Sequence, residues 1–277
     1  MEVSSNFNGM QRHTQLHTYC AIAIAILAWP AYAQTGLGLS PLRVETAIEA
    51  GTTVSNALVL SNVADRTTSI RAEVLDFYVD SEQEPQFVAS SQDAYSCRTW
   101  LRVSPTDVEI APGQRVLVRY TFRIPEEIAA GTYYCAAAFS TAPIPDEKVS
   151  GLSVNVRAIT SFYMTVGRTR PEGTLRRLYV EALPNDSTRS RIVCEVENTG
   201  SYVWRPIGGL SIVSAEGEVL HEIPFRSMPV LPGRKQRFLF PVTEEIPQGA
   251  DLRVRMDIGG GETQEGHFVP AASILPR

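Results

Sequence analysis

The residues in this sequence best suited to covalent chemistry are its cysteines. Cys97 precedes a segment that is typical of a β-strand, and Cys135 lies inside another such segment. An oxidising compartment would make these two thiols a disulfide candidate, worth about 4 kcal/mol in the chain-entropy treatment of the unfolded state. Cys194 lies on the apolar side of an alternating run and is expected to be a buried free thiol.

Catalytic patterns are missing from the chain. His221 and His267 lie in alternating segments, and no nucleophile motif neighbours either of them. The GxSxG, HExxH and nucleotide-loop patterns are absent. Asp80, Glu82 and Glu84 alternate in a way that would suit calcium, but no glycine-centred loop of ligands surrounds them. We therefore expect a protein that is not an enzyme and has no metal site and no cofactor.

The first 33 residues are typical of a secretory signal peptide. The apolar run Cys20–Trp29 is followed by the small-x-small pattern Ala31-Tyr32-Ala33, which predicts cleavage after Ala33. This run is shorter than the roughly 20 apolar residues that a membrane-spanning helix needs. We expect an exported protein whose mature chain begins at Gln34 and which has no stable membrane insertion.

The charge of the chain excludes some partners. The net charge is −5 and the sequence pI is about 5.5. The chain therefore lacks the excess of basic residues that is typical of a nucleic-acid-binding protein. Of the 25 basic residues, only Lys148 and Lys235 are lysines. A cationic site is therefore expected to use arginine, whose planar group suits bidentate contacts to a carboxylate.

The segment Leu152–Met164 would position the most informative row of side chains. Its apolar members alternate with polar ones, so that the apolar ones share a face: Leu152, Val154, Val156 and Ala158. A period of two predicts a β-strand with one apolar and one wet face. Such a strand either packs on its own core or offers its edge and its apolar row to another chain.

Short extended runs separated by turn residues continue after residue 36, which is typical of an antiparallel sandwich. Leu37–Val44 and Val54–Leu60 are predicted to be the first two strands. The polar segment Asp80–Ala94 is predicted to be a long surface excursion.

The chain also contains an internal repeat. The turn Pro112-Gly113 returns as Pro232-Gly233, 120 residues later, and Glu126-Glu127-Ile128 returns as Glu244-Glu245-Ile246, 118 residues later. Upstream, the run that ends at Asn62 is answered by one that ends at Asn198. This recurrence indicates two copies of one β-sandwich unit. The predicted organisation is all-β, with a signal peptide over 1–33, a first sandwich over 34–166 and a second over 167–277.

Three segments of the sequence together resemble those of the periplasmic pilus-assembly chaperones of Gram-negative bacteria. They are the opening strand Leu39–Val44, the run from Tyr133 through Phe139 to Pro145, and the alternating strand that begins at Leu152. The resemblance implies two tandem immunoglobulin-like domains. It also implies that the last strand of the first domain donates apolar side chains to a pilus or surface-protein subunit that lacks a strand, with an outer-membrane usher as a possible second partner.

The resemblance implies a role for particular residues. Leu152, Val154 and Val156 match the donor positions, and Arg43 matches the arginine that anchors the terminal carboxylate of the subunit. The second anchor of the family is a lysine, whose position falls near Thr160. The strand contains no lysine, and its nearest cation is Arg157.

A second resemblance leaves another function open. The phrases Val196–Gly200 and Val230–Gly233 are similar to parts of the tandem sandwich modules of bacterial surface proteins. This alternative implies a module at the cell surface that binds cell-wall polymer or a protein partner. The chaperone resemblance implies the periplasm.

Overall fold

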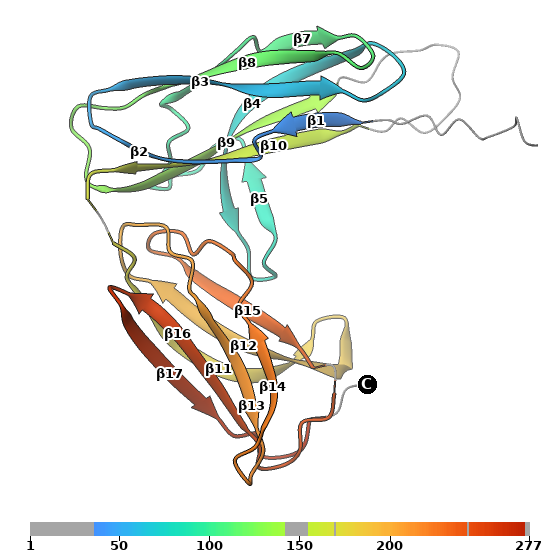
Figure 1. Cartoon of the computed structure of the whole chain (residues 1–277), viewed down its shortest axis with the longest axis vertical. Helices are drawn as coiled ribbons and strands as arrows, with labels where there is room; N and C mark the ends of the chain where they lie inside the picture. Colours follow the sequence, from blue (N-terminus) through green and yellow to red (C-terminus); the bar gives the residue numbers. More distant parts are fainter. Residues whose placement is uncertain (1–35, 142–154, 169, 243, 275–277) are drawn as a thin grey trace, which may run out of the picture. The chain divides into compact units, whose positions relative to one another are not determined.

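The computed structural model describes residues 36–141, 155–168, 170–242 and 244–274 (Figure 1). Every regular element among them is a β-strand, so the all-β prediction is confirmed. In this part of the chain no helix has the length and apolarity needed to cross a bilayer. The strands form two consecutive sandwiches of two sheets each. We call β1–β10 the N-terminal sandwich and β11–β17 the C-terminal sandwich.

The N-terminal sandwich contains the strand order of an immunoglobulin-like fold. Its first sheet has the order β1-β3-β8-β6, and its second has the order β2-β10-β9-β4-β5, with β7 also pairing with β4. The first order and the neighbours β10-β9-β4 correspond to the two sheets of that fold. The strands are β1 (Leu37–Ser40), β2 (Arg43–Ile48), β3 (Thr53–Asn62), β4 (Thr68–Val79), β5 (Pro85–Val88), β6 (Leu101–Ser104), β7 (Asp107–Ile110), β8 (Arg115–Arg123), β9 (Gly131–Thr141) and β10 (Arg157–Val166).

The opening strand is divided between the two sheets. We predicted one strand over Leu37–Val44, but β1 pairs with β3 in one sheet and β2 pairs with β10 in the other. The physical reason lies at Pro41, because proline has no amide hydrogen to donate to a ladder. The chain changes sheets between Ser40 and Arg43, and neither sheet has a continuous first strand.

The last strand of this sandwich begins later than we predicted. The alternation suggested a strand over Leu152–Met164, whereas β10 begins at Arg157 and Val156 precedes it. Leu152 and Val154 lie outside the described residues. β10 pairs along its whole length with β9, and this pairing, rather than the alternation, determines where the strand begins.

The core of the N-terminal sandwich lies between its two sheets. Each sheet contributes alternate side chains to it, from β3 and β8 in the first sheet and from β9 and β10 in the second. This is expected for two sheets packed face to face. The most buried large residues of this core include Leu58, Leu60, Val118, Phe122, Phe139, Phe162 and Met164.

The C-terminal sandwich repeats this plan with fewer strands. Its sheets have the orders β11-β12-β15 and β14-β13-β16-β17. The strands are β11 (Gly173–Leu183), β12 (Asp186–Asn198), β13 (Gly208–Val213), β14 (Val219–Pro224), β15 (Lys235–Pro241), β16 (Asp251–Gly259) and β17 (Glu262–Phe268). Its core includes Val196, Trp204, Phe238, Leu252 and Met256.

The repeat in the sequence corresponds to a repeated buried asparagine. Asn62 donates from Nδ2 to the carbonyl oxygens of Ile110 and Arg66, at 2.8 and 2.7 Å. Asn198 donates in the same way to Val230 and Tyr202, at 2.8 and 2.7 Å. Each side-chain oxygen also accepts a bond from the amide two residues further on. Both side chains therefore fasten their own strand to the segment before a Pro-Gly turn.

The segment Asp80–Ala94 is more than a solvated excursion. It contains β5, which pairs with the end of β4. The turn between them also contacts the C-terminal sandwich, because Glu82 holds Arg191 through two bonds of 2.5 and 2.9 Å. The side chain of Arg191 is only 8% exposed. The sequence pattern missed this contact because the partner of Glu82 lies in the other sandwich.

Candidate partner-binding edge

β10 has one fully paired side and one partly free side. It pairs with β9 over its whole length, but on the other side only Ser161–Val166 pairs, in parallel, with β2. Within the described residues, Arg157–Thr160 therefore has no strand partner on that side. The amide of Ser161 donates to Leu42 at 3.0 Å, so the backbone groups of Ile159 and Arg157, two and four residues earlier, face the same free side.

A second free edge lies close to the first. Among the described residues β1 pairs only with β3, and its residues contact β10 (Figure 1). The change of sheet at Pro41 leaves β1 in one sheet while the unpaired part of β10 belongs to the other. No strand pairing in the part of the chain that the structure describes therefore closes the sandwich between β1 and β10.

The apolar face of β10 loses burial toward this open end. Phe162 and Met164 are fully buried against the opposite sheet. Ala158 and Val156 lie on the same face but are only half-buried. The apolar row that supplies the core of the sandwich therefore extends, at Ala158 and Val156, to the edge of that core.

The side chain of Thr160 lies on the core face of β10. It is buried, and its hydroxyl donates to the carbonyl oxygen of Pro41 at 2.7 Å. Its neighbour Ser161 is in register with Arg43, so Arg43 lies on the opposite face of the sheet from Thr160. The structure does not bring these two predicted site residues together, because successive side chains of a strand point to opposite faces of the sheet.

On the face of the sheet that carries Arg43, the second cation is Arg205. Nε of Arg43 lies 3.3 Å from Oε1 of Glu45, and Nη2 of Arg205 lies 2.6 Å from the same oxygen. The guanidinium of Arg205 also lies 5.1 Å from the centre of the Tyr163 ring, a cation–π distance. A cavity of about 280 Å³ opens beside these groups, with Thr132 in its lining. Arg205 belongs to the loop before β13, and no motif in the sequence marks it.

Burial controls the chemistry of the tyrosine in this cluster. Removal from water raises the pKa of Tyr163 to about 12, although the nearby positive charge of Arg205 opposes that rise. The phenol is therefore neutral at physiological pH. It can donate a hydrogen bond to an anion but carries no charge that would repel one.

The apolar outer face of the second sheet adjoins this cluster. Phe77, Tyr134 and Tyr163 pack there against one another. Val203 and Leu231 of the C-terminal sandwich belong to the same buried cluster. This packing places the loop that carries Arg205 beside β2 and β10.

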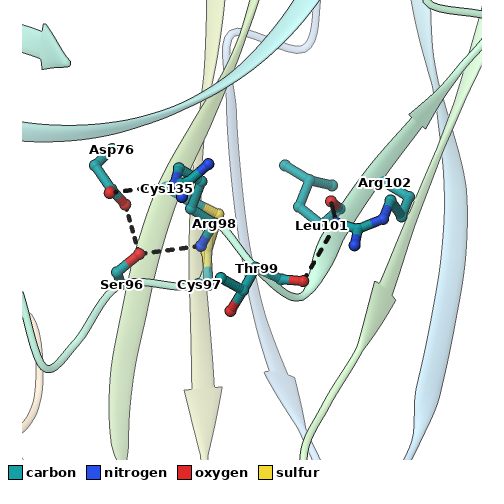
Figure 2. The surroundings of a disulfide bond; sticks show 8 residues. All are labelled: Asp76, Ser96, Cys97, Arg98, Thr99, Leu101, Arg102 and Cys135. Atoms are coloured by element: carbon teal, nitrogen blue, oxygen red, sulfur yellow. Dashed lines mark hydrogen bonds and ion pairs between the residues drawn. A yellow bond between two sulfur atoms is a disulfide. The ribbon is translucent and has the colours of Figure 1, made fainter. Parts of the chain in front are cut away.

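Cys97 and Cys135 are joined by a disulfide, with their Cα atoms 5.3 Å apart (Figure 2). Both residues are fully buried. Figure 2 also shows the side chain of Asp76 bonded to Ser96 and paired with Arg98, which flank Cys97. The disulfide links the segment before β6 to β9, the strand with which β10 pairs along its whole length.

The remaining cysteine and the two histidines of the described chain are either buried or paired with a carboxylate. Cys194 is buried, and burial raises the pKa of its thiol to about 12, so the thiol is unreactive. His221 and His267 each pair with a carboxylate, Glu244 and Asp251, at 3.2 Å. The described part of the chain holds no group of three or more metal-ligand side chains.

Comparisons with known proteins give similarities in structure alone. No protein-family model and no curated protein matches the chain. The E. coli chaperone DraB is 14% identical, with 84% of this chain and 98% of that chain covered and a TM-score of 0.42. The complex of the Salmonella enterica pilin SafA with the chaperone SafB gives 15% identity, coverage of 87% and 99%, and a TM-score of 0.42.

A third similar structure is the pre-assembly complex of the chaperone CsuC and the tip adhesion subunit CsuE from Acinetobacter baumannii. It gives 12% identity, coverage of 84% and 97%, and a TM-score of 0.44. At these identities and TM-scores we take no function from the similarity. The function proposed below is drawn from the residues of this chain.

Proposed function

We propose that the protein is a periplasmic chaperone that binds pilus or surface-protein subunits through the free edge of β10. The observation that carries this proposal is the unpaired side of Arg157–Thr160, next to an apolar row that extends to the edge of its own core. Unpaired backbone groups of Arg157 and Ile159 would bond to a strand of the subunit. Val156 and the residues before it would fill the apolar groove that the missing strand leaves in the subunit.

The arginines near β2 support a second contact with the subunit. Arg43 and Arg205 approach the same point from the two sandwiches. Two guanidinium groups at one point suit a carboxylate, such as the terminal carboxylate of a bound chain. In this proposal Arg205 takes the role that the resemblance assigns to a lysine of the last strand.

This mode of binding explains how a chaperone could work without a nucleotide. The subunit buries its apolar groove against β10, which prevents the aggregation that an exposed groove and a free edge would cause. Release requires only that another strand later packs into the groove of the subunit better than β10 does. A membrane usher would be the site of that exchange.

A co-purification experiment tests the proposal. The tagged mature protein is isolated from the periplasm of its own host, and the proteins that come with it are identified. Val156→Asp should remove the subunit, because a buried carboxylate without a partner is costly in an apolar groove. Val269→Asp, at an exposed valine of the C-terminal sandwich, is the matched control. Recovery of cell-wall polymer in place of a subunit would favour the surface-module alternative.

A further inference from the structure

Glu45 occupies the point at which the two arginines meet. The closest approaches of Arg43 and Arg205 to Glu45 are both to Oε1, at 3.3 and 2.6 Å. Glu45 belongs to β2 and lies two residues from Arg43, so both project from the same face of the strand. The carboxylate of Glu45 therefore stands where the carboxylate of a ligand would have to bind.

Glu45 does not saturate the bonding capacity of this site. Nε and Nη2 of Arg205 are buried and have no hydrogen-bond acceptor among the described residues, so the contact with Glu45 is an ion pair only. A guanidinium prefers two parallel bonds to the two oxygens of one carboxylate. Two positive charges against one negative charge also leave an excess of one positive charge beside the cavity.

The exposures of Arg205 and Glu45 show which of the two side chains can move. The side chain of Arg205 is 22% exposed, and its guanidinium is held against the ring of Tyr163. The side chain of Glu45 is 42% exposed. A carboxylate with this exposure can turn into water at little cost, because half-exposed ion pairs contribute little net free energy.

We infer that Glu45 is an internal occupant of the Arg43–Arg205 site, and that a carboxylate of the bound partner displaces it. This inference rests on the proposed function and adds a competitor that sets the affinity of the site. In the empty protein the arginines are partly neutralised by Glu45. A free small anion competes poorly, whereas a carboxylate that arrives on a strand already paired with β10 gains from both contacts.

The test measures the affinity of two peptides for the full mature protein by calorimetry. One peptide alternates valine with threonine and ends in a free carboxylate, and the other is the same peptide with an amidated C-terminus. Glu45→Gln should bind the free-acid peptide about fivefold more tightly than the unmodified protein, since the carboxylate of residue 45 no longer competes for the two arginines. Its affinity for the amidated peptide should be unchanged.

The matched control is Glu49→Gln, which removes the same charge from an exposed position after β2. It should leave both affinities unchanged. Arg205→Gln should reduce the affinity for the free-acid peptide to that for the amidated one. Equal affinities of Glu45→Gln and the unmodified protein for the free-acid peptide would overturn the inference alone. Failure of both peptides to bind any of the proteins would overturn the proposed function, and the inference with it.

Discussion

The hydroxyl of Thr160 donates a hydrogen bond of 2.7 Å to the carbonyl oxygen of Pro41. This bond lies at the boundary between the two parts of β10. After it, from Ser161 onward, β10 is paired with β2, and before it the same side of the strand is free among the described residues. Thr160 therefore links the point where the opening strand changes sheets to the point where the free edge ends.

Thr160→Val should destabilise the N-terminal sandwich by about 1 kcal/mol, because the buried hydroxyl is lost while the volume of the side chain is kept. The measurement is the urea midpoint of unfolding. Thr67→Val, at an exposed threonine, is the control and should have no effect. An unchanged midpoint for Thr160→Val would show that the bond to Pro41 contributes nothing.

Asn62→Ala and Asn198→Ala should each destabilise their own sandwich by about 2–3 kcal/mol. Each change removes a buried side chain that makes three hydrogen bonds to the backbone. Hydrogen exchange measured by mass spectrometry would locate the loss. If Asn62→Ala loosened the C-terminal sandwich as much as its own, the equivalence of the two asparagines would be wrong.

Replacement of both Cys97 and Cys135 by alanine should lower stability by about 4 kcal/mol, because the bridge restricts the unfolded chain. A thiol assay checks the pairing independently. The mature protein should expose a single reactive thiol, Cys194, and only after unfolding in urea. Two or three reactive thiols in non-reducing urea would contradict the disulfide.

Asp93 should make stability depend on pH in the acid range. Burial raises the pKa of this carboxyl, but bonds from Arg234, Tyr134 and the amide of Tyr95 outweigh burial and hold the pKa below its usual range. A pKa that is lower in the folded than in the unfolded state contributes stability above the unfolded pKa of about 3.9, and this contribution is lost as pH falls through the folded pKa. Asp93→Asn should flatten the fall of the thermal midpoint below pH 4. The same slope in both proteins would contradict this role.

The sequence predicted the features that depend on local spacing. The Pro-Gly turn and the run that ends in an asparagine each occur twice in the same order, and this repetition predicts two copies of one unit. The strand context of Cys97 and Cys135 and an expected oxidising compartment predict their disulfide, and the two residues are joined. Strand alternation assigned Ala158 to the apolar face, which is the face that carries the buried Phe162 and Met164.

What the sequence missed depends on contacts between distant segments. The alternation from Leu152 could not reveal that β10 begins at Arg157, because the pairing with β9 determines that bound. It could not bring Arg205 to Glu45 either, since the two residues belong to different sandwiches. Thr160 was placed beside Arg43 in the site, but the parallel register puts their side chains on opposite faces.

The most direct test of the free edge is a substitution that blocks one backbone group. The amide of Ile159 faces the unpaired side of β10, so Ile159→Pro removes a donor that a partner strand needs, without removing a bond to β9. Ile159→Ala is the control, because it shortens the side chain and keeps the amide. Circular dichroism and thermal unfolding verify that both variants are folded.

The decisive measurement is the amount of subunit that co-purifies with each of these two variants from the periplasm of the host. Edge pairing predicts that Ile159→Pro retains less than about a tenth of the subunit held by Ile159→Ala, a difference of one blocked edge position worth about 1.4 kcal/mol or more. Equal recovery with the two variants would contradict binding through the free edge of β10.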